Sequence, residues 1–530
     1  METLRYLVPP ARTWGDMLAA LSRASYGVEP QQGERFKALF LDTHDGRLQR
    51  GGARLALETR GLLAHWRLQG PHEQGSAIFS GDPGARVFAA PPLGLPEEAA
   101  AAVGQRALIP VVAARVFLRS CTLTCPSGSR LVMALESFAP KPARGRVAGL
   151  PPRLKLLTLR FADGEEVSLL HAGSYLRDRL GLRQEPKDLV SLALQALGKP
   201  EPGGPVPEAL RVRAEDPLAL AGRKIVAQQT LKMRANTEGT IEDLDAEFLH
   251  DLRVATRRLR SALRLFGEAL GRRRADSLRA ELAWIGGLLG AVRDLDVFVA
   301  NLKGQSERLG EAGAIAGVLA HELEGRRGPA RERLVSALQS RRYARLLDRL
   351  KAQASAPLAK SLRGMAALPV TAAGPLLIQR AQKRVLKLGR SVAETTEPPA
   401  LHRLRILFKR LRYTCEFFRD AFGDDMEPYI RAMVRFQDCL GEHQDAVVAM
   451  VRIRDLASDM VARGLIPQQS LLDLGSLLQV QREIAQDRRR KLGELWGQFD
   501  RPSVRRVVRK LATAPEGPSS LPETMRKLLP

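Results

Sequence analysis

The sequence predicts an α+β domain with an antiparallel sheet over residues 1–197 and an almost entirely α-helical domain over residues 208–511. Strand-like segments are confined to the first part, and apolar residues recur at helical spacing in the second. A stretch rich in proline and glycine, residues 198–207, separates the two parts as a linker. The 530 residues are too many for one hydrophobic core, and residues 512–530, with four prolines, are expected to form a flexible tail.

Strand signals in the first domain come from runs rich in β-branched and other apolar residues between turn signals. These runs are Lys37–Asp42, Ala53–Glu58, Ala113–Cys125, Arg130–Glu136 and Arg153–Phe161. The last run turns at Asp163 and Gly164 into a further strand-like segment, Val167–Leu170. A helix near Asp188–Leu197 is expected to close the domain.

The composition of the chain restricts the kinds of partner and cellular location that are expected. The net charge of +25 favours polyanions or anionic surfaces. Apolar runs such as Ala107–Ala114 are too short to span a bilayer, so no membrane helix is expected. Residues 1–5 lack a secretory pattern, which predicts a cytoplasmic protein. Cys121, Cys125 and Cys415 are expected to be buried apolar residues rather than disulfides or metal ligands.

The helical domain contains an internal repeat, with halves of about 208–351 and 376–511. His250 and His402 each begin a helical segment in which cationic residues follow at positions +3, +7, +8 and +10. These cations are Arg253, Arg257, Arg258 and Arg260 in the first copy and Arg405, Lys409, Arg410 and Arg412 in the second, and Arg264 extends the first copy. Positions 0, +3, +7 and +10 share one face of a helix, opposite an apolar face.

A face of this kind predicts an anionic ligand. Neighbouring like charges on a helix cost a few tenths of a kcal/mol per pair, and solvated faces normally mix the two signs. Arginine holds phosphate oxygens bidentately, and a stripe of this length extends about 21 Å, which fits a linear polymer of phosphates. We therefore predict binding of inorganic polyphosphate, with an ordinary solvated helix face as the alternative.

The helix before the second stripe is expected either to form another wall of the binding groove or to be a solvated face. Its cations are Arg380, Lys383, Arg384, Lys387 and Arg390. Hydrogen bonds to phosphate are the expected role of His250 and His402. A metal is disfavoured, because cations lie one turn away and neither stripe has a second carboxylate or thiolate at ligand spacing. No metal or other cofactor is therefore expected.

A second repeated feature follows each stripe. Leu289–Val297 contains Asp294, and Leu440–Val448 contains Asp445. Repetition favours a supporting role for the two acids, which would hold stripe arginines or a helix cap in position.

With these motifs, the helical domain resembles the CHAD family (conserved histidine α-helical domain). The resemblance depends on the His250 and His402 segments, on Leu289–Val297 and on Leu440–Val448. It implies two four-helix bundles, related by pseudo-twofold symmetry around a basic central groove, whose basic residues bind inorganic polyphosphate. Such binding would target the protein to polyphosphate granules.

The first domain resembles a diverged CYTH domain, a triphosphate tunnel fold, which implies an antiparallel sheet or barrel. The resemblance depends on Phe40–Gly52 and Trp66–Pro71. Active members begin with a Glu-x-Glu-x-Lys strand that binds metal and triphosphate. Here only a basic residue, Arg5, remains of that strand, and Gln69 stands in place of a phosphate-binding lysine. Because the metal-holding carboxylates are missing, we expect neither hydrolase activity nor catalytic residues.

Two other functions are weighed against polyphosphate binding. Nucleic acid could bind through its phosphate backbone, although the chain is only 5% aromatic and neither stripe interleaves aromatic residues for base stacking. A triphosphatase with atypical ligands in the first domain is the third reading. The expected partners are inorganic polyphosphate and other polyanions, without a membrane, and the sequence leaves the oligomeric state open.

Overall fold

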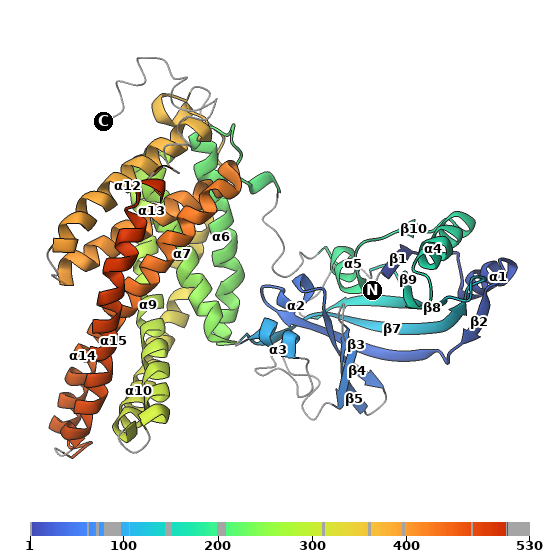
Figure 1. The fold of residues 1–530 in the computed structure, drawn as a ribbon, viewed down its shortest axis with the longest axis horizontal. Coiled ribbons are helices and arrows are strands. Elements are labelled where there is room, and N and C mark those ends of the chain that lie inside the picture. The colour runs from blue at the N-terminus through green and yellow to red at the C-terminus, as the bar shows by residue number, and fades with distance from the viewer. Residues whose placement is uncertain are drawn as a thin grey trace. The chain divides into compact units, whose positions relative to one another are not determined.

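The computed structural model describes residues 3–60, 63–69, 74–78, 97–104, 106–143, 151–198, 208–309, 313–358, 362–394, 398–467, 470–504 and 506. The chain divides into two compact units, Met1–Pro205 and Val206–Pro530 (Figure 1). The predicted linker, apart from Gly198, and the predicted tail lie outside the described residues.

In its described part, the N-terminal unit is one antiparallel sheet of ten strands. The strands are β1 (Thr3–Leu7), β2 (Gly27–Pro30), β3 (Glu34–Thr43), β4 (Arg54–Arg60), β5 (Leu63–Gln69), β6 (Gln74–Ile78), β7 (Leu108–Thr124), β8 (Arg130–Pro142), β9 (Leu154–Asp163) and β10 (Arg183–Gln184). Their order in the sheet is β10-β1-β9-β8-β7-β3-β4-β5-β6, and β2 pairs with β7. The antiparallel sheet and the five strands predicted from Lys37 to Phe161 are confirmed.

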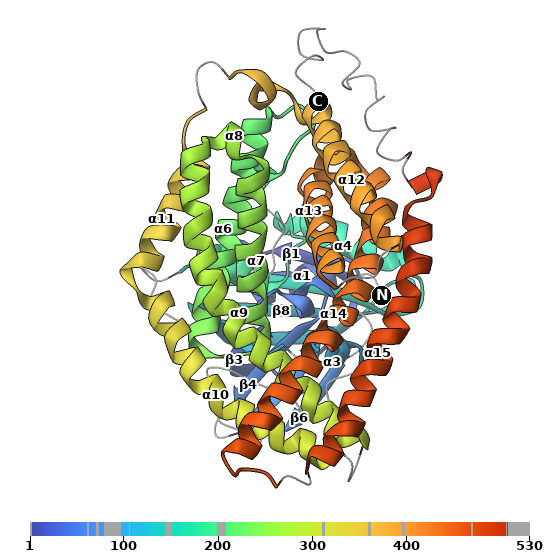
Figure 2. The ribbon, with the colours of Figure 1, turned by 90° about the vertical axis from the view of Figure 1, so that its left-hand side faces the viewer.

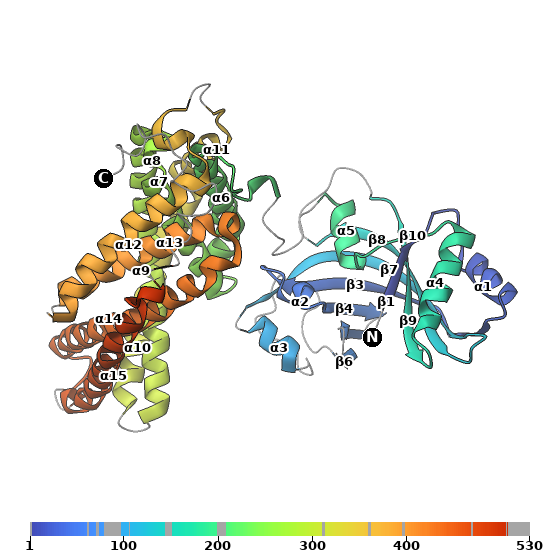
Figure 3. The same ribbon diagram turned by 45° about the horizontal axis from the view of Figure 1, so that its top comes forward.

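Helices cover this sheet at two places. They are α1 (Trp14–Arg23), α2 (Arg47–Arg50), α3 (Glu97–Val103), α4 (Val167–Leu180) and α5 (Leu189–Ala196). Helices α1 and α4 pack on β7, β8 and β9 in one apolar core, whereas α5 packs on β3, β7 and β8 in another (Figure 3). The predicted closing helix is confirmed as α5, with Asp188 as its N-cap.

The predicted strand Val167–Leu170 is wrong, because these residues form the first turn of α4. Leu169, Ala172, Leu176 and Leu180 are all buried in α4 and recur at helical spacing. The four-residue run was too short to reveal this helical period, which extends to Leu180.

In the residues that the structure describes, the helical unit has two sets of four long helices. The first set is α6 (Leu218–Glu242), α7 (Ala246–Leu265), α9 (Arg272–Leu309) and α10 (Ala314–Gln339), and the second is α12 (Val370–Glu394), α13 (Pro398–Phe422), α14 (Glu427–Ala462) and α15 (Ser470–Phe499). Shorter elements connect them: η1 (Glu208–Leu210), α8 (Gly267–Leu270), α11 (Arg341–Ser355), η3 (Gly364–Ala367) and η4 (Gly423–Met426). The predicted all-α architecture is confirmed. The second set begins at Val370, earlier than the predicted start at residue 376, and Pro375 lies inside α12.

The repeat is regular in its first two helices. Val370 follows Leu218, and Pro398 follows Ala246, by the same 152 residues that separate His402 from His250. Two glycines in equivalent positions, Gly222 and Gly374, let aromatic rings pack closely, since a Cβ at either would lie 2.9 Å from a phenylalanine side chain. Equivalent residues of α6 and α12, and of α7 and α13, can therefore be compared directly.

One hydrophobic core joins the two repeats. Apolar residues of α6, α7 and α9 belong to the same buried cluster as those of α12, α13 and α14. The contact between α7 and α13 includes Phe266, whose ring centroid lies 6.2 Å from that of Phe417 and 5.8 Å from that of Phe418. Figure 2 shows α7 and α13 in the middle of the unit, between the outer helices of the two sets.

A second core lies at the other ends of α9, α10, α14 and α15, where Phe298, Leu319 and Ile453 are buried. Cys121, Cys125, Cys415 and Cys439 are buried free thiols, as predicted for the first three. Among the described residues, no helix combines the length and the apolar character that a bilayer crossing requires.

Candidate anion-binding site

The apolar faces of α7 and α13 fix their cationic faces against each other. Leu252, Leu259 and Leu263 of α7, and Leu404 and Leu411 of α13, are buried in the shared core. Asp245 caps α7 by accepting hydrogen bonds from the backbone N–H of Glu247 at 2.8 Å and of Phe248 at 3.0 Å. The cations opposite this apolar face are thereby held on rigid helices rather than on loops.

Four predicted cations form a central cluster, which we define as Arg253 and Arg257 of α7 and Arg405 and Lys409 of α13. Burial, followed by the charges of Arg405, Arg257 and Arg253, lowers the pKa of Lys409 to about 8. Burial also lowers the pKa of Arg257, with further contributions from Arg253, Arg412 and Arg405 and an opposing one from Tyr413. Each repeat thus supplies cations to one shared point, as the matched stripes suggested.

Donors of the central cluster are left without partners. The Nε atoms of Arg257 and Arg405 are buried, and neither has a hydrogen-bond partner among the described residues. A buried charged donor without an acceptor costs free energy that an anion would recover. Gly441, in the second repeated motif, lies beside Arg405, because a Cβ there would be in van der Waals contact with Nη2 of Arg405, at 3.5 Å.

The two supporting acids differ. Asp294 accepts a hydrogen bond from Nη2 of Arg253 at 3.4 Å and lies 3.9 Å from Nη2 of Arg452. Asp445 is exposed and raises the pKa of Lys409 against the larger opposing effects. Both acids therefore act on cations of the central cluster, one by a direct contact and the other through its charge.

The two histidines also differ. His250 is partly buried, and burial, together with the charge of Arg293 and against that of Glu247, lowers its pKa. Its imidazole is therefore neutral at pH 7 and able to donate one hydrogen bond. His402 is exposed.

Two predicted ligands, Arg258 and Arg412, are already engaged by an acid that the sequence analysis missed. Glu416 of α13 lies 2.7 Å from Nη1 of Arg258 and 3.2 Å from Nε of Arg412. The buried ring of Tyr413 lies beneath both guanidinium groups, with its centroid 5.6 and 5.5 Å from their Cζ atoms. Glu416 stands at +14 from His402, the position that Arg264 occupies after His250, so reading the second stripe one turn further would have found it.

The remaining predicted cations lie towards the solvent. Arg260, Arg264, Arg380, Lys383, Arg384, Lys387 and Arg410 are exposed. Arg390 is exposed as well, but its Nε and Nη2 each donate a hydrogen bond of 3.0 Å to Asp500. Partial desolvation lowers the pKa of Arg410, with contributions from Arg384 and from Arg279 of α9. The structure thus brings Arg384, from the preceding helix, next to the second stripe, and it adds Arg279, which the sequence analysis did not include.

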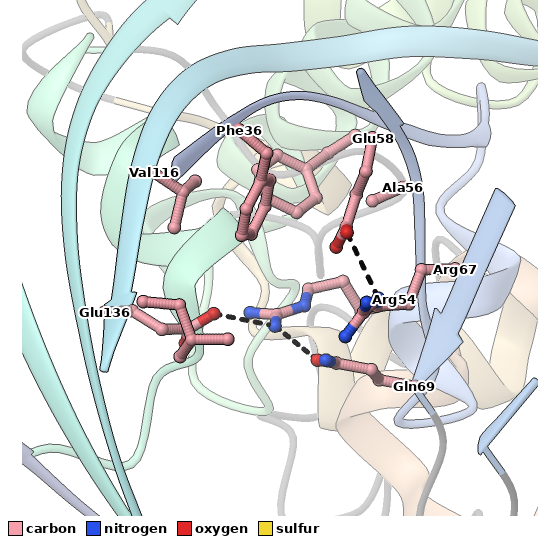
Figure 4. Close-up of a pocket in the computed structure, with 10 residues that line it drawn as sticks. Phe36, Arg54, Ala56, Glu58, Arg67, Gln69, Val116 and Glu136 are labelled. Atoms are coloured by element: carbon pink, nitrogen blue, oxygen red, sulfur yellow. Dashed lines mark hydrogen bonds and ion pairs between the residues drawn. The ribbon is translucent and has the colours of Figure 1, made fainter. Parts of the chain in front are cut away.

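Among the described residues, no three side chains of the metal-ligating types gather at one point. The N-terminal unit instead contains a small polar cavity, between β3, β4, β5, β7 and β8, of about 10 Å³, which is room for no more than one water molecule (Figure 4). Arg54 points into it, forms an ion pair of 3.0 Å with Glu136 and donates a hydrogen bond to Gln69. Glu58 lies 3.1 Å from Nε of Arg67 across the same cavity. The cations of this cavity are therefore matched by acids of the same sheet.

The segment from Phe40 to Gly52 has a structural role in this unit. Asp42 is buried and accepts hydrogen bonds from the backbone N–H groups of Thr43, Leu48 and Gln49, at 2.6, 2.9 and 3.0 Å. Burial raises the pKa of Asp42, while these three hydrogen bonds oppose the shift. The carboxylate thus holds the turn from β3 into α2.

Known proteins are similar to parts of this chain. Two proteins of Mycobacterium tuberculosis, described as uncharacterized, are 31% identical to it over 346 residues, which is 59% of this chain and 61% of theirs. The chain therefore spans about three fifths of the length of these relatives. The crystal structure of the CHAD domain from the plant Ricinus communis is 28% identical and covers 57% of this chain and 95% of its own, with a TM-score of 0.38.

A structure from Hippeastrum, titled as a putative adenylyl cyclase with a dominant triphosphatase activity, is 12% identical and covers 38% of this chain and 97% of its own, with a TM-score of 0.22. The family model described as CHAD domain matches residues 224–454, which run from α6 into α14 and include both cationic helices. The helical unit of this chain thus contains a CHAD domain.

Proposed function

We propose that the helical unit binds inorganic polyphosphate, without catalysis, in a basic groove lined by the two cationic helices. The central cluster supports this proposal best, because two repeats bring four cations together and leave the buried Nε atoms of Arg257 and Arg405 without acceptors. The charged, non-bridging phosphate oxygens would accept from these donors and relieve the repulsion that adds to burial in lowering the pKa of Lys409.

The length of the cationic surface favours a polymer over a single small anion. Along α7, Arg253 and Arg264 are separated by a helical rise of about 16 Å. Exposed cations continue beyond the central cluster at Arg410 and Arg384. A chain of phosphates can contact all of them at once, whereas one phosphate group can contact only part of the set.

Nucleic acid would meet the same cations through its phosphates, and it is the second candidate. The ring of Tyr413 at the site makes binding of single-stranded nucleic acid by base stacking unfavourable. Tyr413 is only 2% exposed, and its ring lies against Arg257, Arg258 and Arg412. It therefore offers no free face on which a base could stack.

A competition titration tests the proposal. Long-chain polyphosphate, duplex DNA and RNA are titrated at physiological salt into the full chain and into Arg253→Glu/Arg405→Glu. Polyphosphate is expected to bind the wild type much more tightly than either nucleic acid, and the variant is expected to lose it. Arg341→Glu/Arg345→Glu on α11 is the matched control, since these two arginines are exposed and lie outside both cationic helices. Equal affinity for nucleic acid, or equal losses in both variants, would contradict the proposal.

For the N-terminal unit, the proposal includes the absence of triphosphatase activity. Arg54 fills the cavity and is neutralised by Glu136, and the volume that remains holds about one water molecule. Incubation with tripolyphosphate and Mg²⁺ or Mn²⁺ should release no phosphate beyond the rate without protein. Metal-dependent release of phosphate that disappears in Arg54→Ala would show that this cavity opens and hydrolyses tripolyphosphate.

Binding of this kind would place the protein on polyphosphate granules in the cytoplasm. A fluorescent fusion of the full chain is expected to colocalise with the granules, whereas the fusion that carries Arg253→Glu/Arg405→Glu is expected to be diffuse. Colocalisation of both fusions would show that another surface directs the protein there.

A further inference from the structure

The two flanks of the central cluster differ in charge although the repeat makes them equivalent. One flank, which we name the neutral flank, contains Lys232, Asp251, Arg258 and Glu416. Each of these residues has an equivalent in the other repeat, 152 residues away. Lys232, Asp251 and Arg258 correspond to Arg384, Arg403 and Arg410, and Glu416 corresponds to Arg264. We name these four equivalents the cationic flank. The neutral flank has two cations and two acids, whereas the cationic flank has four cations.

Contacts of the neutral flank show that its charges meet. Arg258 of α7 and Glu416 of α13 form an ion pair of 2.7 Å across the contact between the repeats. Lys232 of α6 is exposed but partly desolvated, which lowers its pKa; Arg258 lies close enough to lower it further, while Asp251 and Glu416 oppose the shift. The cations of this flank are therefore compensated by its own acids.

The cationic flank has charges of one sign only. In the repeat, Arg264 and Arg410 are the equivalents of Glu416 and Arg258, which form the ion pair of the other flank. The charges of Arg264 and Arg410 interact, since partial desolvation and then Arg410, Arg279 and Arg260 lower the pKa of Arg264. No member of the cationic flank forms an ion pair with any residue that the structure describes.

Arg279 of α9 also lies next to this flank, but it is already paired with an acid of its own helix. Asp276 accepts a hydrogen bond from its Nη1 at 2.6 Å, so this guanidinium is held in place from its own helix. The four arginines of the cationic flank itself have no acid among them, and such an arrangement costs repulsion that an ordinary surface avoids. The other flank shows that the fold accommodates acids at the equivalent positions.

We propose that bound polyphosphate leaves the central cluster on one side only, over Arg264, Arg410 and Arg384, so that this flank selects long chains over short ones. The inference rests on the proposed function of the central cluster. Short chains are held by the central cluster alone, whereas longer chains gain contacts along the cationic flank. The neutral flank offers no comparable gain, since its two acids repel the polymer as strongly as its cations attract it.

The test compares Arg384→Ala with Lys232→Ala, which remove one exposed cation at equivalent positions of α12 and α6. Affinities of the full chain for tripolyphosphate and for long-chain polyphosphate are measured at several salt concentrations. Arg384→Ala should weaken long-chain binding several-fold and reduce the slope of log affinity against log salt by about one, as expected for one lost phosphate contact. Lys232→Ala should leave both unchanged, and tripolyphosphate should bind all three proteins alike.

Arg264→Ala provides a second variant on the cationic flank and should behave like Arg384→Ala. Equal losses in Arg384→Ala and Lys232→Ala, or equal losses for tripolyphosphate and the long chain, would overturn the one-sided path while leaving polyphosphate binding intact. If the wild type bound neither phosphate, the proposed function would fail, and this inference with it. Thermal unfolding of each variant establishes that the helical unit remains folded.

Discussion

Raising the pH from 7 to 9 is expected to weaken polyphosphate binding about tenfold, because it removes the charge of Lys409. The pKa of this side chain in the free protein is about 8, lowered by burial and then by Arg405, Arg257 and Arg253. Lys409 is therefore about nine-tenths charged at pH 7 and about one-tenth charged at pH 9. A bound polyanion favours the ammonium form and raises its pKa, so binding takes up a proton. Affinity is then greatest below pH 8 and falls as the pH rises through it.

Titrations of long-chain polyphosphate at constant ionic strength, from pH 6.5 to 9.5, would measure this dependence. Lys409→Arg is the control, because a guanidinium keeps its charge over the whole range and should hold affinity nearly constant. The polymer titrates identically in both experiments, so the difference between the two proteins isolates residue 409. A parallel decline of wild type and Lys409→Arg would refute the argument, since the proton would then belong to another group.

Three other perturbations follow from the contacts described. Long-chain polyphosphate at 100 times its dissociation constant should raise the free energy of unfolding of the wild type by about 2.7 kcal/mol, measured by calorimetry. The same concentration should leave the free energy of unfolding of Arg253→Glu/Arg405→Glu unchanged. Arg54→Ala removes the partner of the largely buried Glu136 and should lower the free energy of unfolding of the N-terminal unit by about 3 kcal/mol in denaturant titrations, whereas Arg54→Met/Glu136→Leu should recover most of it. Gly389→Ala drives a Cβ into the ring of Trp496 and should cost about 1–3 kcal/mol, while Gly493→Ala, with open space at its Cβ, should cost no stability.

Sequence periodicity predicted most of the fold. Alternation and turn residues located the long strands, and helical spacing located the repeated helices, because each pattern records which face is buried. The failure at Val167–Leu170 has the same basis. Four residues do not distinguish a strand from a helix whose buried residues extend to Leu180.

The candidate site was predictable in its cations but not in their partners. Spacing from His250 and His402 identified the residues that the structure brings together as the central cluster. It did not show that Glu416 of α13 engages Arg258 of α7, because that contact depends on how two helices distant in sequence cross. For the same reason, the sequence did not reveal that Arg279 lies near the cationic flank, because this proximity depends on how α9 packs beside α7.

The unequal flanks bear on why both repeats belong to one polypeptide. In a dimer of identical single repeats, a true twofold axis would copy every substitution to both sides, so an acid at the position of Glu416 would also replace Arg264. Covalent linkage removes that constraint and lets the two positions mutate separately. In the proposed binding mode, the fused chain thus directs the polymer to one side of the bundle, although the two ends of the polymer are chemically alike. Any neighbouring domain or partner would then meet the emerging polymer at a fixed side of the bundle.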